Sequence, residues 1–263
     1  MADMRNLEII TLKQIQRLED NWIESPVPIA RTVICNFKSE QYRQMINESY
    51  YWKKELYNSF LTIAKFRQLK ITKEQSFVNV EKALMIGAFI IRKLDDAEKI
   101  PPDFLDRKVP LDFSNSRITI VDSMNWHKLD HHYDFDMIVK IEKDWRFIIN
   151  QLIHSFTFLF SYDNANKLDG FLINSDQTKK QGLFILPLNI LLTFFLTVSE
   201  GAITSGNYYR QTIEDKNGMI NTGEMKLENA TYSYHSRFDI EKEIIETLQG
   251  NIYKRKATDS ISG

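Results

Sequence analysis

The stretch WRFIINQLIHSFTFLFSYD, residues 145–163, decides the predicted fold because its hydrophobic pattern changes in the middle. Up to Phe156, apolar residues cover most of a helix, while Arg146, Asn150 and His154 recur at steps of four. Four residues advance about 400° around a helix, so these three polar side chains share one face. After Phe156 the run TFLFSYD favours a strand. We therefore expect the chain to change from helices to strands here.

Ahead of this stretch the sequence favours helices. Apolar residues recur at helical spacing over residues 11–23, 39–70 and 76–99. A short strand, Arg117–Val121, and a polar, aromatic loop are expected to follow, and Asp134 or Asp136 is expected to cap the helix of the opening stretch.

Beyond Phe156 the pattern predicts strands with short turns, then a helix over residues 188–200, a hairpin around the NG and TG pairs, and a last helix that ends at Gly250. The predicted fold class is α+β. A mainly α-helical N-terminal bundle, residues 1–156, ends with the Arg146/Asn150/His154 helix. A small antiparallel β-meander with packed helices covers residues 157–250, and residues 251–263 form a flexible tail.

One segment is long and apolar enough to suggest a membrane span. No charged residue interrupts the run from Gln181 to Ser199. A helix cannot continue through Pro187 without cost, and Asn189, Thr193 and Thr197 add polar groups to the run. We expect a buried strand over residues 183–186 and a helix that starts at Pro187 instead.

Composition bounds the class of protein. Among 263 residues, 34 Lys and Arg nearly cancel 35 Asp and Glu, so no overall charge indicates nucleic-acid or membrane binding. The single cysteine, Cys35, excludes an internal disulfide and a cysteine-cluster metal site. The first residues lack the basic region and apolar run of a signal peptide, so we expect a cytoplasmic protein with no membrane anchor.

The polar stripe of Arg146, Asn150 and His154 has two interpretations. A polar stripe on a helix that is otherwise apolar needs partners, which a second helix, a second copy of the chain or a cleft would supply. In the structural interpretation Arg146 pairs with a carboxylate and His154 bonds to a carbonyl. In the functional interpretation the stripe faces a cleft and carries chemistry.

The run INQLIHS, residues 149–155, resembles the signature of HEPN-domain proteins, in which an arginine, a polar residue and a histidine lie in one long helix. Many proteins of that family are metal-independent ribonucleases of phage-defence or toxin–antitoxin systems, and they are usually dimers. The resemblance implies an RNA substrate, no cofactor, and catalytic roles for His154 and Asn150.

The arginine of that signature has no direct counterpart, because Ile149 occupies its position. Without a cation the charge on the scissile phosphate loses its main stabiliser. Arg146, one turn earlier, is the first candidate to replace it, and Arg92 in a preceding helix is the second. Three further cations near the C-terminus are candidates for RNA binding, namely Lys254, Arg255 and Lys256.

A metal-dependent enzyme is a weaker alternative. His127 and His131 are four residues apart, with His132 and several aspartates nearby, and imidazole and carboxylate groups bind zinc. The segment lacks a firm metal motif, so the predicted site contains no metal. The sequence also lacks a glycine-rich phosphate loop and the GxSxG motif, which disfavours nucleotide-dependent enzymes and serine hydrolases.

Two functions follow from the sequence as hypotheses. The first is a HEPN-like bacterial ribonuclease or RNA-binding protein. The second is a non-catalytic interaction subunit of a defence complex that docks a partner protein. The second hypothesis predicts that Ile149 belongs to the core, that Arg146 forms a salt bridge, and that no pocket surrounds His154.

Overall fold

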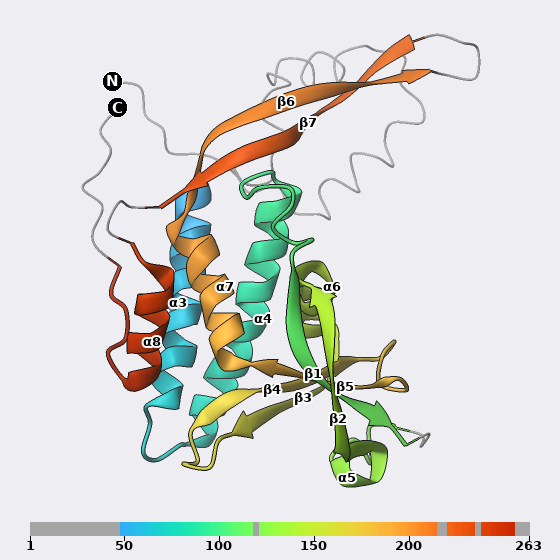
Figure 1. The fold of residues 1–263 in the computed structure, drawn as a ribbon, viewed down its shortest axis with the longest axis vertical. Coiled ribbons are helices and arrows are strands. Elements are labelled where there is room, and N and C mark those ends of the chain that lie inside the picture. Colours follow the sequence, from blue (N-terminus) through green and yellow to red (C-terminus); the bar gives the residue numbers. More distant parts are fainter. Residues whose placement is uncertain (1–47, 118–120, 215–219, 235–237, 256–263) are drawn as a thin grey trace, which may run out of the picture. The chain divides into compact units, whose positions relative to one another are not determined.

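The computed structural model describes residues 48–117, 121–214, 220–234 and 238–255 (Figure 1). In these ranges the helices are α3 (Ser49–Arg67), α4 (Glu74–Asp96), α5 (Leu129–His132), α6 (Trp145–Ile153), α7 (Leu188–Glu200) and α8 (Ile240–Gln249). The strands are β1 (Lys108–Ser116), β2 (Tyr133–Asp144), β3 (Ser155–Tyr162), β4 (Leu168–Ser175), β5 (Gly182–Pro187), β6 (Ala202–Glu214) and β7 (Ile220–Ser233). The predicted helix over residues 11–23, Cys35 and Lys256 lie outside the described residues.

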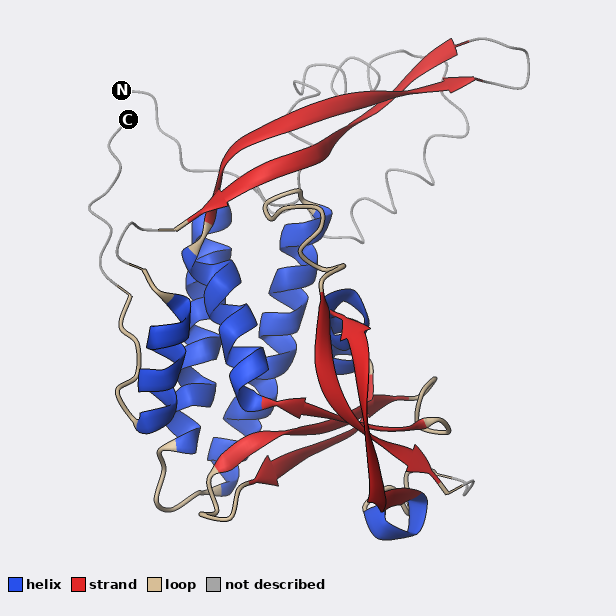
Figure 2. Ribbon diagram, in the orientation of Figure 1, coloured by secondary structure: helices blue, strands red, loops and turns tan. Residues whose placement is uncertain are grey.

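Five strands form one antiparallel sheet in the order β2-β1-β5-β4-β3 (Figure 2). β1 connects the edge strand β2 to the other three strands, because it pairs with β2 on one side and with β5 on the other. Phe113 of β1 lies opposite Val139 of β2 and Phe184 of β5. The rings of Phe113 and Phe184 pack against each other at 4.9 Å between centroids.

The predicted mainly helical N-terminal bundle is wrong. β1 and β2 precede residue 156 and yet belong to the same sheet as the three strands that follow it. The residues expected to cap a helix, Asp134 and Asp136, lie in β2, where both accept from Arg117 at 3.1 and 3.5 Å. The prediction failed because β2 is an edge strand, and its many exposed charged residues hide the alternation that marks a buried strand.

Three helices, α3, α4 and α7, pack together and supply much of the core (Figure 2). Leu56 of α3, Leu84 of α4 and Phe195 of α7 are fully buried. A side chain at Gly87 of α4 would place its Cβ 2.3 Å from the Phe195 ring. Glycine at this position therefore lets the α7 ring pack directly against the backbone of α4.

Helix α6, which holds the opening stretch, connects β2 to β3 and has only nine residues. Asp144 begins it, since its carboxylate accepts from the Phe147 amide at 2.7 Å. The helix ends at Ile153, and His154 is its C-cap. The long helix expected up to Phe156 is thus shorter, because Ser155 already pairs with Ser175 in the sheet.

The strand and helix expected over residues 183–200 are confirmed. β5 ends at Pro187, and α7 begins at the next residue. Proline has no amide hydrogen, so it suits a position just ahead of the first turn. None of the described helices is both long enough and apolar enough to cross a membrane.

Strands β6 and β7 form a separate two-stranded ribbon that follows α7 (Figure 1). Its register runs from Ala202 opposite Ser233 to Glu214 opposite Ile220, with three irregularities. The predicted antiparallel pairing is therefore confirmed, but the NG pair lies outside the described residues, the TG pair lies within β7, and the strands are longer than the turn signals indicated. After the ribbon, α8 ends at Gly250 as predicted, with a φ of 112° that favours glycine.

Candidate functional site

Arg146 of α6 is held by two carboxylates. Its Nη1 donates to Asp95 Oδ2 at 2.9 Å, and its Nε donates to Asp106 Oδ1 at 3.3 Å. Burial raises the pKa of Asp95, while the hydrogen bond and positive charge of Arg146 act in the opposite direction. Arg146 therefore fixes α6 to the end of α4 and to the loop that precedes β1.

The rest of the predicted catalytic stripe is exposed. Asn150 and His154 both face solvent, and the His154 amide bonds to the Asn150 carbonyl at 3.0 Å. Ile149 is 0% exposed and belongs to the core. Neither Asn150 nor His154 lines the two pockets described below. The interaction hypothesis predicts a buried Ile149, a salt bridge at Arg146 and no pocket around His154, and the described structure matches these three expectations.

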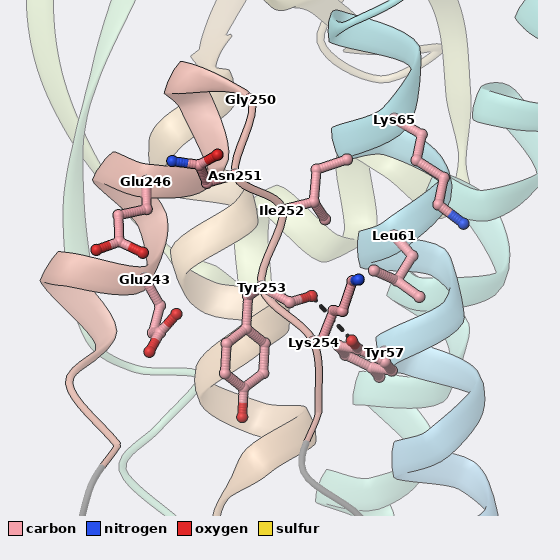
Figure 3. Close-up of a pocket in the computed structure, with 10 residues that line it drawn as sticks. All are labelled: Tyr57, Leu61, Lys65, Glu243, Glu246, Gly250, Asn251, Ile252, Tyr253 and Lys254. Atoms are coloured by element: carbon pink, nitrogen blue, oxygen red, sulfur yellow. Dashed lines mark hydrogen bonds between the residues drawn. The ribbon is translucent and has the colours of Figure 1, made fainter.

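The remaining cations proposed to bind RNA have separate surroundings. Arg92 pairs with Asp96 of its own helix at 3.3 Å, and Arg255 pairs with Glu200 at 3.3 Å. Lys254 lines an open groove of about 800 Å³ between α3 and the segment that follows α8 (Figure 3). The positive charge of Arg92 also acts to lower the pKa of Asp95, the partner of Arg146, whereas Arg255 is paired at the end of α7.

The histidine segment has structural contacts. The buried His132 ring lies 3.0 Å from the Asn125 carbonyl through Nε2, and its centroid is 5.2 Å from that of His131. Among the described residues, no group of three or more His, Cys, Asp or Glu side chains could hold a metal ion. The geometry thus gives no support to a metal site at His127 and His131.

A buried polar cluster at the base of the ribbon was not anticipated from the sequence. Lys53 of α3 is only 4% exposed, and its Nζ donates to the Gly201 carbonyl at 2.7 Å and to the Tyr232 hydroxyl at 3.1 Å. The Tyr232 hydroxyl in turn donates to the Val198 carbonyl at 2.8 Å. Burial, with the charges of Arg255 and Lys99, lowers the pKa of Lys53 to about 8. This cluster ties the end of α7 and β7 to α3.

The segment after α8 extends the same cluster. Arg255 pairs with Glu200, and the Tyr253 hydroxyl donates to the second oxygen of that carboxylate at 3.1 Å. The Tyr57 hydroxyl donates to the Tyr253 carbonyl at 2.9 Å (Figure 3). It also accepts from the Arg255 amide at 2.7 Å. Burial raises the pKa of Glu200, against the opposing charge of Arg255. The tail predicted to begin at residue 251 is thus held against α3 as far as Arg255.

Gly201 joins α7 to the ribbon under tight packing. A Cβ at this position would lie 2.1 Å from the Tyr232 ring, so no other residue fits without a shift. The Tyr232 ring also meets the Phe104 ring edge to face, with 4.8 Å between ring centroids. Tyr232 is therefore enclosed between Gly201, Lys53 and Phe104, and the first residues of the ribbon have a fixed position on the helices.

Beyond this base most side chains of the described ribbon are exposed, although Leu227 is buried. Tyr208 and Met225 are 51% and 49% exposed, and Tyr209 is 41% exposed. Tyr208 lies opposite Leu227 and Arg210 opposite Met225, so these four side chains share one face of the ribbon. Most other described residues on it are exposed and polar, namely Thr204, Ser205, Asn207, Thr222, Glu224, Lys226, Glu228, Asn229 and Thr231.

Only part of this arrangement has a signal in the sequence. Lys53 precedes Leu56, Tyr57 and Phe60 at spacings of three, four and seven, which places it on the buried face of α3. A lysine on an apolar face calls for a partner, but the sequence does not name Gly201 or Tyr232, which follow more than a hundred residues later.

No protein-family model matches the chain, and no curated protein or solved structure is similar enough to count as a match.

Proposed function

We propose that the chain is a non-catalytic binding protein that docks a partner protein through the β6–β7 ribbon. The observation that carries this proposal is a long two-stranded ribbon with exposed Tyr and Met side chains on a buried base, where Lys53 bonds to Gly201 and Tyr232. Large exposed apolar and aromatic side chains that lie together mark interaction surfaces. The ribbon pairs with no strand of the five-stranded sheet, so packing within the described chain does not account for its length.

The composition of the ribbon favours a protein over a nucleic acid. Over residues 202–233 the basic residues are Arg210, Lys216 and Lys226, and the acidic ones are Glu214, Asp215, Glu224 and Glu228, which gives three minus four, a formal charge of −1. Nucleic-acid affinity depends largely on neutralised phosphates, and a ribbon with no net positive charge offers little of this. Tyr, Ser, Asn and Gly are typical of protein-binding loops that rely on aromatic contact and adaptable hydrogen bonds.

The fixed base supports the same conclusion. Association costs free energy for every group that must become ordered, and a surface that is already ordered avoids part of that cost. Lys53 and Tyr232 join the ribbon to α3 and α7. At Gly201, between α7 and β6, the backbone packs directly against the Tyr232 ring. The cluster therefore presents the ribbon in one orientation.

The first test separates the ribbon from the rest of the surface. The tagged full-length chain, its Tyr208→Ala/Met225→Ala variant and a control Tyr51→Ala/Ile71→Ala variant are each expressed in the cells from which the gene comes. The control removes two side chains that are also strongly exposed, 69% and 82%, but lie outside the ribbon. We expect a protein that co-purifies with wild type and control but not with the ribbon variant.

The same samples test the nucleic-acid alternative. Fluorescein-labelled single-stranded RNA and duplex DNA, each of about 20 nucleotides per strand, are titrated with all three proteins at about 0.15 M salt, where electrostatic binding is moderate. If the protein binds either nucleic acid tightly and the ribbon substitutions abolish that binding, the partner of the ribbon is a nucleic acid and not a protein. Equal co-purification with wild type and ribbon variant would contradict the proposal.

A metal-independent ribonuclease of the HEPN type is the second candidate. The exposure of Asn150 and His154 favours it, because a substrate can reach both side chains. The ribonuclease also needs a cation at the scissile phosphate, and Arg146, the first candidate, already pairs with Asp95 and Asp106. Expression of wild type and His154→Ala in one host, with growth and RNA integrity scored together, tests it. RNA cleavage by wild type that the variant lacks would favour the ribonuclease over the binding protein.

A further inference from the structure

Three polar residues of α7 lie on one face. Asn189, Thr193 and Thr197 are spaced by four, and the three of them line a pocket of about 380 Å³. Most of the remaining surface of α7 is apolar and buried. A volume of this size is typical of a small-molecule site.

The other walls of the pocket are aromatic and aliphatic. Trp145 of α6 and Phe194 of α7 stack in parallel, with 3.8 Å between ring centroids and 6° between planes. Phe104, Val109, Pro110 and Ile190 complete the apolar lining. Such walls favour a flat apolar ligand.

The polar side chains in the pocket lack protein partners. Among the described residues, none of Asn189, Thr193 and Thr197 has a side-chain hydrogen bond, whereas Thr62 of α3 bonds to the Asn58 carbonyl one turn back. Threonine in a helix commonly makes that bond to its own backbone. Thr193 and Thr197 therefore keep their hydroxyl groups available to a ligand.

One cation lies at the pocket. Arg107 packs over the Phe104 ring at 4.1 Å and pairs with Asp103 at 2.8 Å. Both partners of this ion pair are more than half exposed, 54% and 64%, and such surface pairs are weak. A carboxylate bound in the pocket can therefore replace that of Asp103, and guanidinium binds carboxylate through two parallel hydrogen bonds.

We propose that this pocket binds a small aromatic carboxylic acid, with its ring against Trp145 and Phe194, its carboxylate on Arg107, and its polar edge on the free α7 side chains. The site does not include the exposed ribbon residues Tyr208 and Met225, so it goes beyond the proposed docking function, while its wall residue Phe104 also packs against Tyr232 at the ribbon base. Arg107, Asp103 and the three polar α7 residues belong neither to the proposed docking surface nor to the stripe of Arg146, Asn150 and His154.

The test uses two probes that differ only in charge, 2-naphthoate and 2-naphthamide. Saturation-transfer NMR and calorimetry measure their binding to the full chain. The variants are Arg107→Gln, which removes the cation, and Thr193→Val, which replaces one hydroxyl by a methyl group. The controls are Arg117→Gln and Thr62→Val, which change an arginine and a threonine that do not line the pocket. Circular dichroism of each variant confirms that it is folded.

We expect naphthoate to bind wild type and both controls with equal affinity, and naphthamide to bind at least about tenfold more weakly. Arg107→Gln should remove the preference for naphthoate, and Thr193→Val should weaken both probes by a few fold. Absence of naphthoate binding at millimolar concentration overturns the proposal. So does binding that all four variants leave unchanged, or equal affinity of the two probes for wild type.

Discussion

At the scale of single residues, Lys53 gives the base of the ribbon a distinct pH dependence. Its folded pKa of about 8 lies below the ordinary value of 10.5. Between these values the unfolded chain binds more protons than the folded chain, so the contribution of Lys53 to stability rises with pH. Below pH 8 both states carry the charge, and its burial lowers stability by a constant amount.

We therefore predict a pH effect that Lys53→Met abolishes. From pH 8 to about pH 9.5, below the ordinary range of the tyrosines, wild type should gain about 2 kcal/mol in its free energy of unfolding relative to the variant. Urea unfolding at a series of pH values measures this difference. Parallel pH profiles of the two proteins would show that Lys53 titrates normally.

A second residue-scale prediction concerns Gly201. A methyl group there meets the Tyr232 ring, so Gly201→Ala should cost about 1–3 kcal/mol of stability. Tyr232→Leu removes the ring that the methyl group strikes, so the two substitutions together should cost less than their sum. A double-mutant cycle from thermal unfolding measures this coupling. Additive losses would mean that the two residues do not contact each other.

Arg146 shows what the sequence can and cannot specify at one position. Its helical spacing from Asn150 and His154 is visible in the sequence, and so is the need for a partner. Its partners are not, because Asp95 and Asp106 lie 51 and 40 residues away and reach it only through the packing of α4 on α6.

Because Arg146 pairs with both carboxylates, Arg146→Gln should lower the free energy of unfolding by about 1–2 kcal/mol, measured in urea. A variant as stable as wild type would contradict this structural role.

At the scale of elements, segments with a buried face are the predictable ones. α7 and β5 were predicted nearly to the residue because Pro187 separates two apolar runs. β2 was missed because Met137, Ile138 and Val139 lie exposed on an edge among charged neighbours. The ribbon was underestimated because most of its strand residues are polar, and only its turn signals and the alternation around Tyr232 were visible.

The ribbon yields an element-scale prediction of its own. Tyr208 and Met225 are about half exposed, so replacing both by alanine should change the free energy of unfolding by less than about 0.5 kcal/mol each. Thermal unfolding of the Tyr208→Ala/Met225→Ala variant measures this. A large loss of stability would mean that these side chains serve the fold and would weaken the docking proposal.

At the scale of the whole described chain, residues distant in sequence meet at the ribbon base. α3 supplies Lys53 and Tyr57, α7 ends in Glu200, and the segment after α8 contributes Tyr253 and Arg255. No local pattern in the sequence predicts such a meeting, because it depends on the packing of α3 against α7 and α8.

Truncation tests this assembly. Removal of residues 251–263 deletes both partners of Glu200 and leaves a largely buried carboxylate without its cation, which should cost about 3 kcal/mol. Removal of residues 256–263 deletes none of these contacts and serves as the control. Differential scanning calorimetry should show a lower Tm for the first truncation only. Equal Tm values would mean that the C-terminal segment does not support the ribbon base.

The central claim is that the β6–β7 ribbon binds a protein partner, and calorimetry on the purified partner tests it most directly. The protein captured with wild type is titrated into wild type, into Tyr208→Ala/Met225→Ala and into Tyr51→Ala/Ile71→Ala. We expect a loss of at least about tenfold in affinity for the ribbon variant, with the control equal to wild type. Equal affinities for all three proteins would contradict the claim.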